Sequence, residues 1–213
     1  RHRALGPIVR QAPLPFVANT EHTVGMFALD IPRWTAEAVR ALPHEPGKRF
    51  ECVDGELLVS PGPRLAHQSA VTVLLRQLDT YCETHRAGAV FTSPGELVLD
   101  ALTLVQPDVY VLPLVQGRRP RAADEVGTPL LLAEVLSPST ARFDRVVKRQ
   151  RYQRLGVEYW IVDLEARVAE RWLPGDTRPE VCTDTLSWVT SPAADVPCVI
   201  DLGRLIVEVL GPL

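Results

Sequence analysis

One apolar segment that carries a single acid, Leu130–Leu136, limits most strongly what this chain can fold into. Ser137-Pro138 ends the segment, and its length suits a buried strand. Glu134 lies late in this strand. A buried carboxylate costs several kcal/mol unless it is paired with a cation or binds a metal. The segment therefore predicts a core strand whose acid has a positively charged partner.

Local signals predict three helices and a hairpin in the first three quarters of the chain. Asp54-Gly55 is a preferred type I′ turn dipeptide, so residues 50–59 are expected to form a β-hairpin. Thr35 is a plausible N-cap for a short helix over about 35–42. Residues 66–86 have the spacing of an amphipathic helix. A further helix over 140–155 is expected to end at Gly156.

The remaining segments indicate strands. They are expected at about 89–92, 96–100, 107–112, 129–136, 158–163 and 168–173, more weakly near 180–183 and 187–190, with a strand and a short helix within 196–210. Residues 116–127 are expected to form a loop. This order predicts an α/β fold: a mixed β-sheet flanked by helices, with an N-terminal β-hairpin and a C-terminal strand extension.

Length and composition predict one globular domain. The 213 residues, 46% of them hydrophobic, divide into an expected N-terminal arm (1–30) and a single domain (31–213) with its core at about 45–175. The net charge of −3 argues against a strong nonspecific nucleic-acid binder. The four cysteines form no CxxC pair, which favours reduced, buried thiols in a cytoplasmic protein. We find neither a membrane-spanning apolar stretch nor a signal-peptide segment.

A second acid, Asp108, opens the apolar run Val109–Leu112 and follows Pro107. Proline lacks an N–H group, so this position suits a strand entry. If this strand and that of Glu134 are neighbours, both carboxylates can converge on one hard cation. Oxygen ligands with spare water positions suit Mg²⁺ or Mn²⁺. The two acids therefore predict a divalent-metal site at one end of two strands.

Lys148 is one of only two lysines, against twenty-one arginines. With Asp144 and Tyr152 it shares one face of the helix that follows the Glu134 strand. Lysine is a compact point charge, whereas arginine is a rigid fork. Spacing alone leaves two interpretations equally open. Lys148 reaches the acids as an active-site ammonium, or it forms a surface ion pair with Asp144 of small energetic value.

The combination of motifs resembles the Uma-type restriction-endonuclease family of the PD-(D/E)XK nuclease superfamily, over about residues 33–173. The matching segments are Phe50-Glu51 with Asp54–Leu57, Ser60–Pro63 with His67, Gln106–Val109, Glu134–Thr140, Asp144, Lys148, Tyr152 and Gly156–Asp163. Leu136 stands where the superfamily pattern has its lysine. The resemblance implies that Lys148 supplies this ammonium from the following helix.

The same resemblance implies a restriction-endonuclease-like fold and a Mg²⁺- or Mn²⁺-dependent endonuclease, a hydrolase acting on ester bonds. Asp108, Glu134 and the Val135 carbonyl would hold the metal. DNA is favoured over RNA by this analogy alone, and a homodimer would suit cleavage of two strands. The alternative is a catalytically silent interaction or dimerisation protein with the same fold. A third possibility is a hydrolase that uses the carboxylates as an acid–base pair.

Several further side chains are candidates with equally weighted alternatives. His67 is expected either to contact the scissile phosphate or to be a polar surface residue at a helix start. Glu51 either completes the acidic cluster or points outward from the hairpin. Five arginines are expected to bind nucleic-acid phosphates or to be solvated: Arg142, Arg145, Arg149, Arg118 and Arg119. Three strand aromatics are expected to pack in the core or at a dimer interface: Tyr159, Trp160 and Trp172.

Overall fold

A computed structural model describes residues 33–190 and 196–212. The expected N-terminal arm, residues 1–30, lies outside the described residues. The helices are α1 (Ala36–Arg40), α2 (Leu65–His85), α3 (Ala141–Phe143), α4 (Arg149–Leu155) and α5 (Leu202–Leu210). A 3₁₀ turn covers Ala123–Glu125, and a π-helical turn, Asp144–Lys148, joins α3 to α4.

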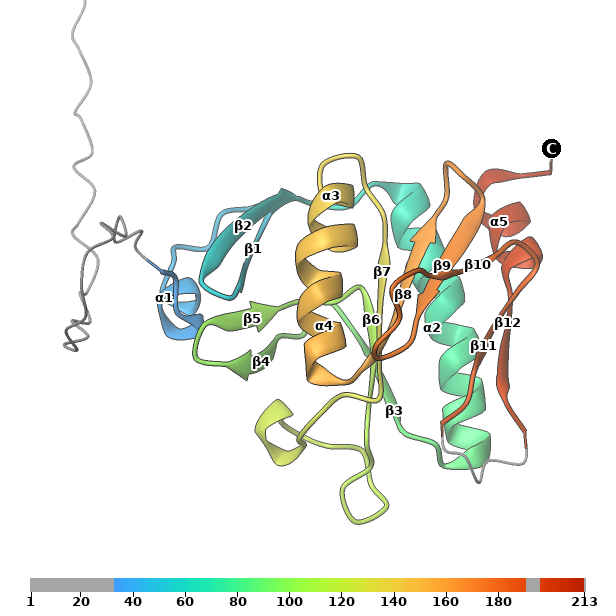
Figure 1. Cartoon of the computed structure of the whole chain (residues 1–213), viewed down its shortest axis with the longest axis horizontal. Coiled ribbons are helices and arrows are strands. Elements are labelled where there is room, and N and C mark those ends of the chain that lie inside the picture. The colour runs from blue at the N-terminus through green and yellow to red at the C-terminus, as the bar shows by residue number, and fades with distance from the viewer. Residues whose placement is uncertain (1–32, 191–195, 213) are drawn as a thin grey trace, which may run out of the picture. The chain divides into compact units, whose positions relative to one another are not determined.

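Strands make up the rest of the regular structure (Figure 1). They are β1 (Lys48–Val53), β2 (Glu56–Pro61), β3 (Ala89–Thr92), β4 (Leu97–Asp100), β5 (Thr103–Val105), β6 (Val109–Leu112), β7 (Leu131–Val135), β8 (Glu158–Asp163), β9 (Val168–Trp172), β10 (Glu180–Cys182), β11 (Thr185–Trp188) and β12 (Cys198–Asp201).

The central sheet has the strand order β10-β9-β8-β7-β6-β3, and β7–β8 is its one parallel pair. The predicted mixed sheet is therefore confirmed. The predicted hairpin is β1–β2, and both turn residues have positive φ, 51° at Asp54 and 84° at Gly55. It belongs to a second sheet, β2-β1-β5-β4, while β11 and β12 pair separately.

Helices cover both faces of the central sheet (Figure 1). Strand β7 shows how the alternation of side chains divides the core. Leu131, Ala133 and Val135 pack with α2 and α5, whereas Leu132 packs with Tyr152 of α4. Glu134 therefore lies on the α4 face. The side chains of Tyr159, Trp160 and Trp172 are buried, which confirms the core-packing expectation for these three aromatics.

The predicted elements differ from the structure at four places. Strand β5 was not predicted, because its three residues give too short a pattern to recognise. The second weak strand is Thr185–Trp188 rather than 187–190. The expected loop 116–127 contains the 3₁₀ turn. The expected continuous helix 140–155 is interrupted by the π-helical turn. Within the described residues, no helix combines the length and apolar character needed to cross a membrane.

Candidate active site

The two predicted carboxylates meet where β6 begins and β7 ends. Val109 pairs with Ala133 in an antiparallel ladder, so the next position brings Asp108 opposite Glu134. The Val135 N–H donates to Asp108 Oδ2 at 2.9 Å, and the Asp108 N–H donates to Glu134 Oε2 at 3.3 Å. The backbone amide next to Glu134 thus fixes the Asp108 carboxylate, and the backbone amide of Asp108 fixes the Glu134 carboxylate. Both residues are 2% exposed.

Lys148 reaches Glu134 from the helical layer that contains α3 and α4. Its ammonium lies 2.8 Å from Glu134 Oε1, 3.0 Å from Glu51 Oε1 and 3.5 Å from Asp144 Oδ1. All four side chains are at most 3% exposed. The alternative of a surface pair between Asp144 and Lys148 is therefore wrong. The structure instead brings Lys148 to Glu134, one of the two predicted metal ligands, and to Glu51.

The π-helical turn carries both Asp144 and Lys148 into the site. The Arg149 N–H donates to the carbonyl of Asp144, five residues back instead of four. Asp144 and Lys148 are the turn's two buried residues. The Tyr159 hydroxyl, from β8, donates to the same Asp144 carbonyl at 3.4 Å. π-Helical turns are frequent at functional sites. The helical periodicity of the sequence did not indicate the π-helical turn at Asp144–Lys148.

Strand β1 contributes two side chains to the site from alternate positions. Glu51 is 1% exposed, and its Oε1 accepts a 2.7 Å hydrogen bond from the Gln106 N–H. The alternative of an outward-pointing Glu51 is therefore wrong. Arg49, two residues earlier on the same face, donates to Asp108 Oδ1 at 3.2 Å. Sequence reasoning missed Arg49, although its period-two spacing from Glu51 was the signal that could have found it.

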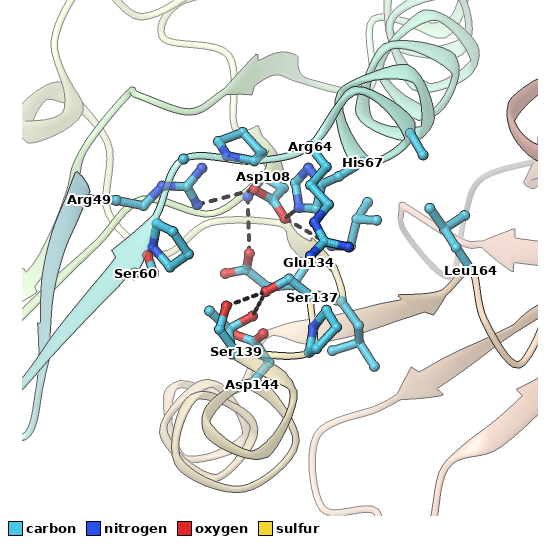
Figure 2. Close-up of a pocket in the computed structure, with 18 of the residues that line it drawn as sticks. Arg49, Ser60, Arg64, His67, Asp108, Glu134, Ser137, Ser139, Asp144 and Leu164 are labelled. Carbon is cyan, nitrogen blue, oxygen red and sulfur yellow. Dashed lines mark hydrogen bonds and ion pairs between the residues drawn. The ribbon is translucent and has the colours of Figure 1, made fainter. Parts of the chain in front are cut away.

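His67 approaches from the first turn of α2. Its Nε2 lies 3.0 Å from Asp108 Oδ2, and its side chain is 12% exposed. The alternative of a surface histidine is therefore wrong. Its Nδ1 is buried and has no hydrogen-bond partner among the described residues. Figure 2 shows Arg49 and His67 reaching Asp108 from opposite sides, with Glu134 beside it.

These side chains line a cavity of about 440 Å³. The loop Pro61–Arg64 bounds it on one side, and Leu136–Thr140 bounds it on another. In the second loop the Ser137 hydroxyl lies 3.0 Å from the Ser139 hydroxyl and 2.9 Å from that of Thr140. Thr140 is the N-cap residue of α3 but makes no side-chain capping bond. The cavity leaves room for a ligand directly in front of the carboxylates.

Burial and neighbouring charges shift the pKa values of the site's side chains in different directions. Burial alone would raise the pKa of Asp108, but contacts with His67, Arg49 and the Val135 amide lower it to about 2. Burial raises the pKa of Glu134 well above its ordinary value, although Lys148 partly opposes this. Burial alone would lower the pKa of Lys148, but its carboxylate neighbours raise it well above the ordinary value.

Three of the arginines predicted to bind nucleic acid, Arg142, Arg145 and Arg149, do not line this cavity. Arg145 pairs with Asp163 and Glu170, each at 2.7 Å, and the Arg149 guanidinium lies over the Trp172 ring. Their contacts tie the helix to β8 and β9. Arg142 is exposed, and none of the three is among the residues that line the cavity.

Arg118 and Arg119 lie in the loop between β6 and β7. Arg118 pairs with Glu125 at 2.8 Å and Arg119 with Asp79 at 3.1 Å. This loop joins the strand ends that lie opposite Asp108 and Glu134. Binding of nucleic acid by all five arginines therefore stays a prediction, and these two are at the far end of the strands from the cavity.

The donor set fits a hard divalent cation. Four carboxyl groups, those of Asp108, Glu134, Glu51 and Asp144, gather around the Lys148 ammonium and the Arg49 guanidinium in a buried cluster, so oxygen donors outnumber the cations. In the described part of the chain, no three His, Cys, Asp or Glu side chains form a ready metal cage. Two carboxylates plus the backbone of Val135, which lines the cavity, would leave positions for water.

Comparison with known proteins places the chain in a family. A solved structure titled "Crystal structure of a putative nuclease belonging to DUF820 from Anabaena variabilis" superposes with a TM-score of 0.65 at 16% identity. The alignment covers 83% of this chain and 99% of that one. This likeness confirms the restriction-endonuclease-like α/β fold that the resemblance implied. No curated protein matches the chain. A family model described as "Putative restriction endonuclease" matches residues 36–198, and the chain therefore belongs to this family, Uma2.

Proposed function

We propose that the protein is a Mg²⁺- or Mn²⁺-dependent nuclease that hydrolyses phosphodiester bonds, with DNA as its substrate. One observation carries the proposal: Asp108, Glu134 and Lys148 converge in one cavity of a nuclease-like fold. Asp108, Glu134 and the Val135 carbonyl would hold the metal. The preference for DNA follows from the family description alone.

When bound, the divalent ion supplies a Lewis acid for the phosphoryl group and makes water more acidic. The protein's side chains position the other reactants. The Lys148 ammonium, fixed by Glu51 and Glu134, is placed to stabilise the extra negative charge of the transition state. A water oxygen bonds to phosphorus and loses a proton to the solvent as the bond to the leaving oxygen breaks, and the leaving oxygen takes up a proton from the solvent.

Glu51 has a positioning role in this proposal. It bonds both the Lys148 ammonium and the Gln106 N–H, next to the Pro107-Asp108 segment. It therefore couples the lysine to the strand entry that carries the first metal ligand. His67, whose Nε2 bonds Asp108, is placed to contact the substrate phosphate at the cavity's edge. The proposed homodimer would bring two such cavities to the two strands of a duplex.

A cleavage assay tests the proposal. Plasmid, single-stranded DNA and RNA are incubated with Mg²⁺, Mn²⁺ or EDTA, together with the nearly isosteric variants Asp108→Asn, Glu134→Gln and Lys148→Met. Each variant is expected to lower cleavage at least about hundredfold, as removal of one electrostatic stabiliser does. The exposed Glu56 gives a matched control, and Glu56→Gln should cleave like the wild type.

The outcomes separate the candidate functions. Cleavage that persists in EDTA would favour an acid–base hydrolase over a metal enzyme. Full activity of Glu134→Gln would exclude the proposed site. Absence of cleavage on all three substrates, together with absence of Mn²⁺ binding in calorimetry, would favour the catalytically silent interaction protein.

A further inference from the structure

Arg49 is bound to the carboxylate that the proposed metal needs. Its Nη1 lies 3.2 Å from Asp108 Oδ1 and 3.2 Å from the Gln106 carbonyl oxygen, and its Nη2 lies 3.0 Å from Ser93 Oγ. The other oxygen, Asp108 Oδ2, already accepts from Val135 and lies next to His67. Positively charged or N–H groups thus surround Asp108 on the cavity side.

In this arrangement Arg49 and a metal ion would both bind the Asp108 carboxylate. An ion about 2.1 Å from Asp108 Oδ1 would lie at most about 5.3 Å from the Arg49 Nη1 atom if that atom kept its 3.2 Å contact with the same oxygen. Two cations at that separation in a partly buried site repel each other strongly. Arg49 and a divalent ion are therefore competitors for Asp108.

The Arg49 guanidinium has space to move away from Asp108. Its side chain is 17% exposed and lines the cavity, so the guanidinium can leave Asp108 without crossing the core. The planar guanidinium suits the oxygens of a phosphate group. A scissile phosphate held in front of the carboxylates would come within reach of the displaced guanidinium.

We propose that Arg49 is an exchangeable counter-ion: it neutralises Asp108 until the divalent ion binds, and then turns to the phosphate of the nucleic acid. This role rests on the proposed function and names the group that couples metal binding to substrate binding.

Mn²⁺ affinity, measured by calorimetry without nucleic acid, tests the competition. Arg49→Met should bind Mn²⁺ about tenfold more tightly than the wild type, because the repelling charge is gone. Arg49→Lys keeps the charge and should stay closer to the wild type. Arg64 is exposed at the same cavity, so Arg64→Gln is the matched control for loss of one charge and should change affinity less than about threefold.

A duplex-binding assay with Ca²⁺ in place of Mn²⁺ tests the second half of the role. Arg49→Met should bind a short DNA duplex about tenfold more weakly despite its tighter hold on metal, because a charged phosphate contact is lost. A residue that merely braced β1 against Asp108 would give neither the gain in metal affinity nor this opposite change.

One measurement on the wild-type protein remains valid if Arg49→Met does not fold. Phenylglyoxal modifies accessible guanidinium groups, and peptide mass spectrometry resolves Arg49 from the other arginines. Adding Mn²⁺ should raise the modification of Arg49. Unchanged or lower modification, or unchanged Mn²⁺ affinity in Arg49→Met, would overturn the exchange while leaving the nuclease proposal standing. A wild type that binds no Mn²⁺ would overturn both.

Discussion

Replacing Lys148 by methionine should destabilise the metal-free protein severely. Methionine keeps much of the side chain's length but removes the ammonium that contacts three carboxyl groups. Lys148 lies 2.8 Å, 3.0 Å and 3.5 Å from Glu134, Glu51 and Asp144. Removing one partner of a buried ion pair costs about 3–5 kcal/mol, and three partners place this variant at the upper end. That is a large share of the roughly 5–15 kcal/mol that stabilises a typical domain.

Urea denaturation at pH 7.5 in EDTA, followed by tryptophan fluorescence, measures this loss. Trp160 and Trp188 are buried and report on the core. The chain's other lysine supplies the control: Lys48 pairs with Glu45 while about half exposed, so Lys48→Met should cost less than about 1 kcal/mol. A second substitution, Lys148→Met with Glu51→Gln, should recover part of the stability because it removes one unpaired charge.

Two results would refute the reasoning. A loss below about 1 kcal/mol for Lys148→Met would mean that the ammonium is not desolvated among its partners. Equal losses for the two lysine variants would have the same meaning. Either result would also remove the structural basis for placing Lys148 in the active site.

Three further outcomes are expected. The four buried cysteines should resist alkylation at pH 8 in the native protein and react fully in urea, because burial raises the pKa of Cys82 and of Cys198 to about 12 and so disfavours the thiolate. Deleting the half-exposed Val146 should convert the π-helical turn to α-helix and move the Lys148 backbone about 1.5 Å along the helix axis toward α3, lowering cleavage, whereas Val146→Ala should leave cleavage intact. Gly55→Ala should cost about 1 kcal/mol or more in urea denaturation, since φ is 84° there.

The sequence predicted those parts of the fold that repeat a local pattern. Asp54-Gly55 identified the hairpin because only a few residue types tolerate its turn. Thr35 identified the start of α1, where its hydroxyl accepts from the Ala38 N–H at 3.0 Å. Strand β5 escaped because three residues carry too little periodicity. The π-helical turn escaped because its one-residue offset leaves an overall helical pattern unchanged.

The site was predictable where a residue contradicted its surroundings. An acid in an apolar strand and a lysine in an arginine-rich chain were both anomalies, and the structure brings Glu134 and Lys148 within 2.8 Å of each other. Arg49 was not anomalous: it is one arginine among many, at the start of a polar hairpin strand. Its position beside Asp108 depends on how two sheets meet, which no local pattern encodes.

The bond between Lys148 and Glu51 has a consequence for how the protein folds. It joins positions 97 residues apart, and Glu51 must also reach the segment before β6. Closing so long a loop is entropically costly, and contacts of this kind favour slow folding. The helical turn that carries Lys148 is synthesised after the three segments that supply the other acids: β1 with Glu51, the entry to β6 with Asp108, and β7 with Glu134. A chain synthesised only as far as β7 therefore lacks the Lys148 ammonium and has no complete cluster of charges.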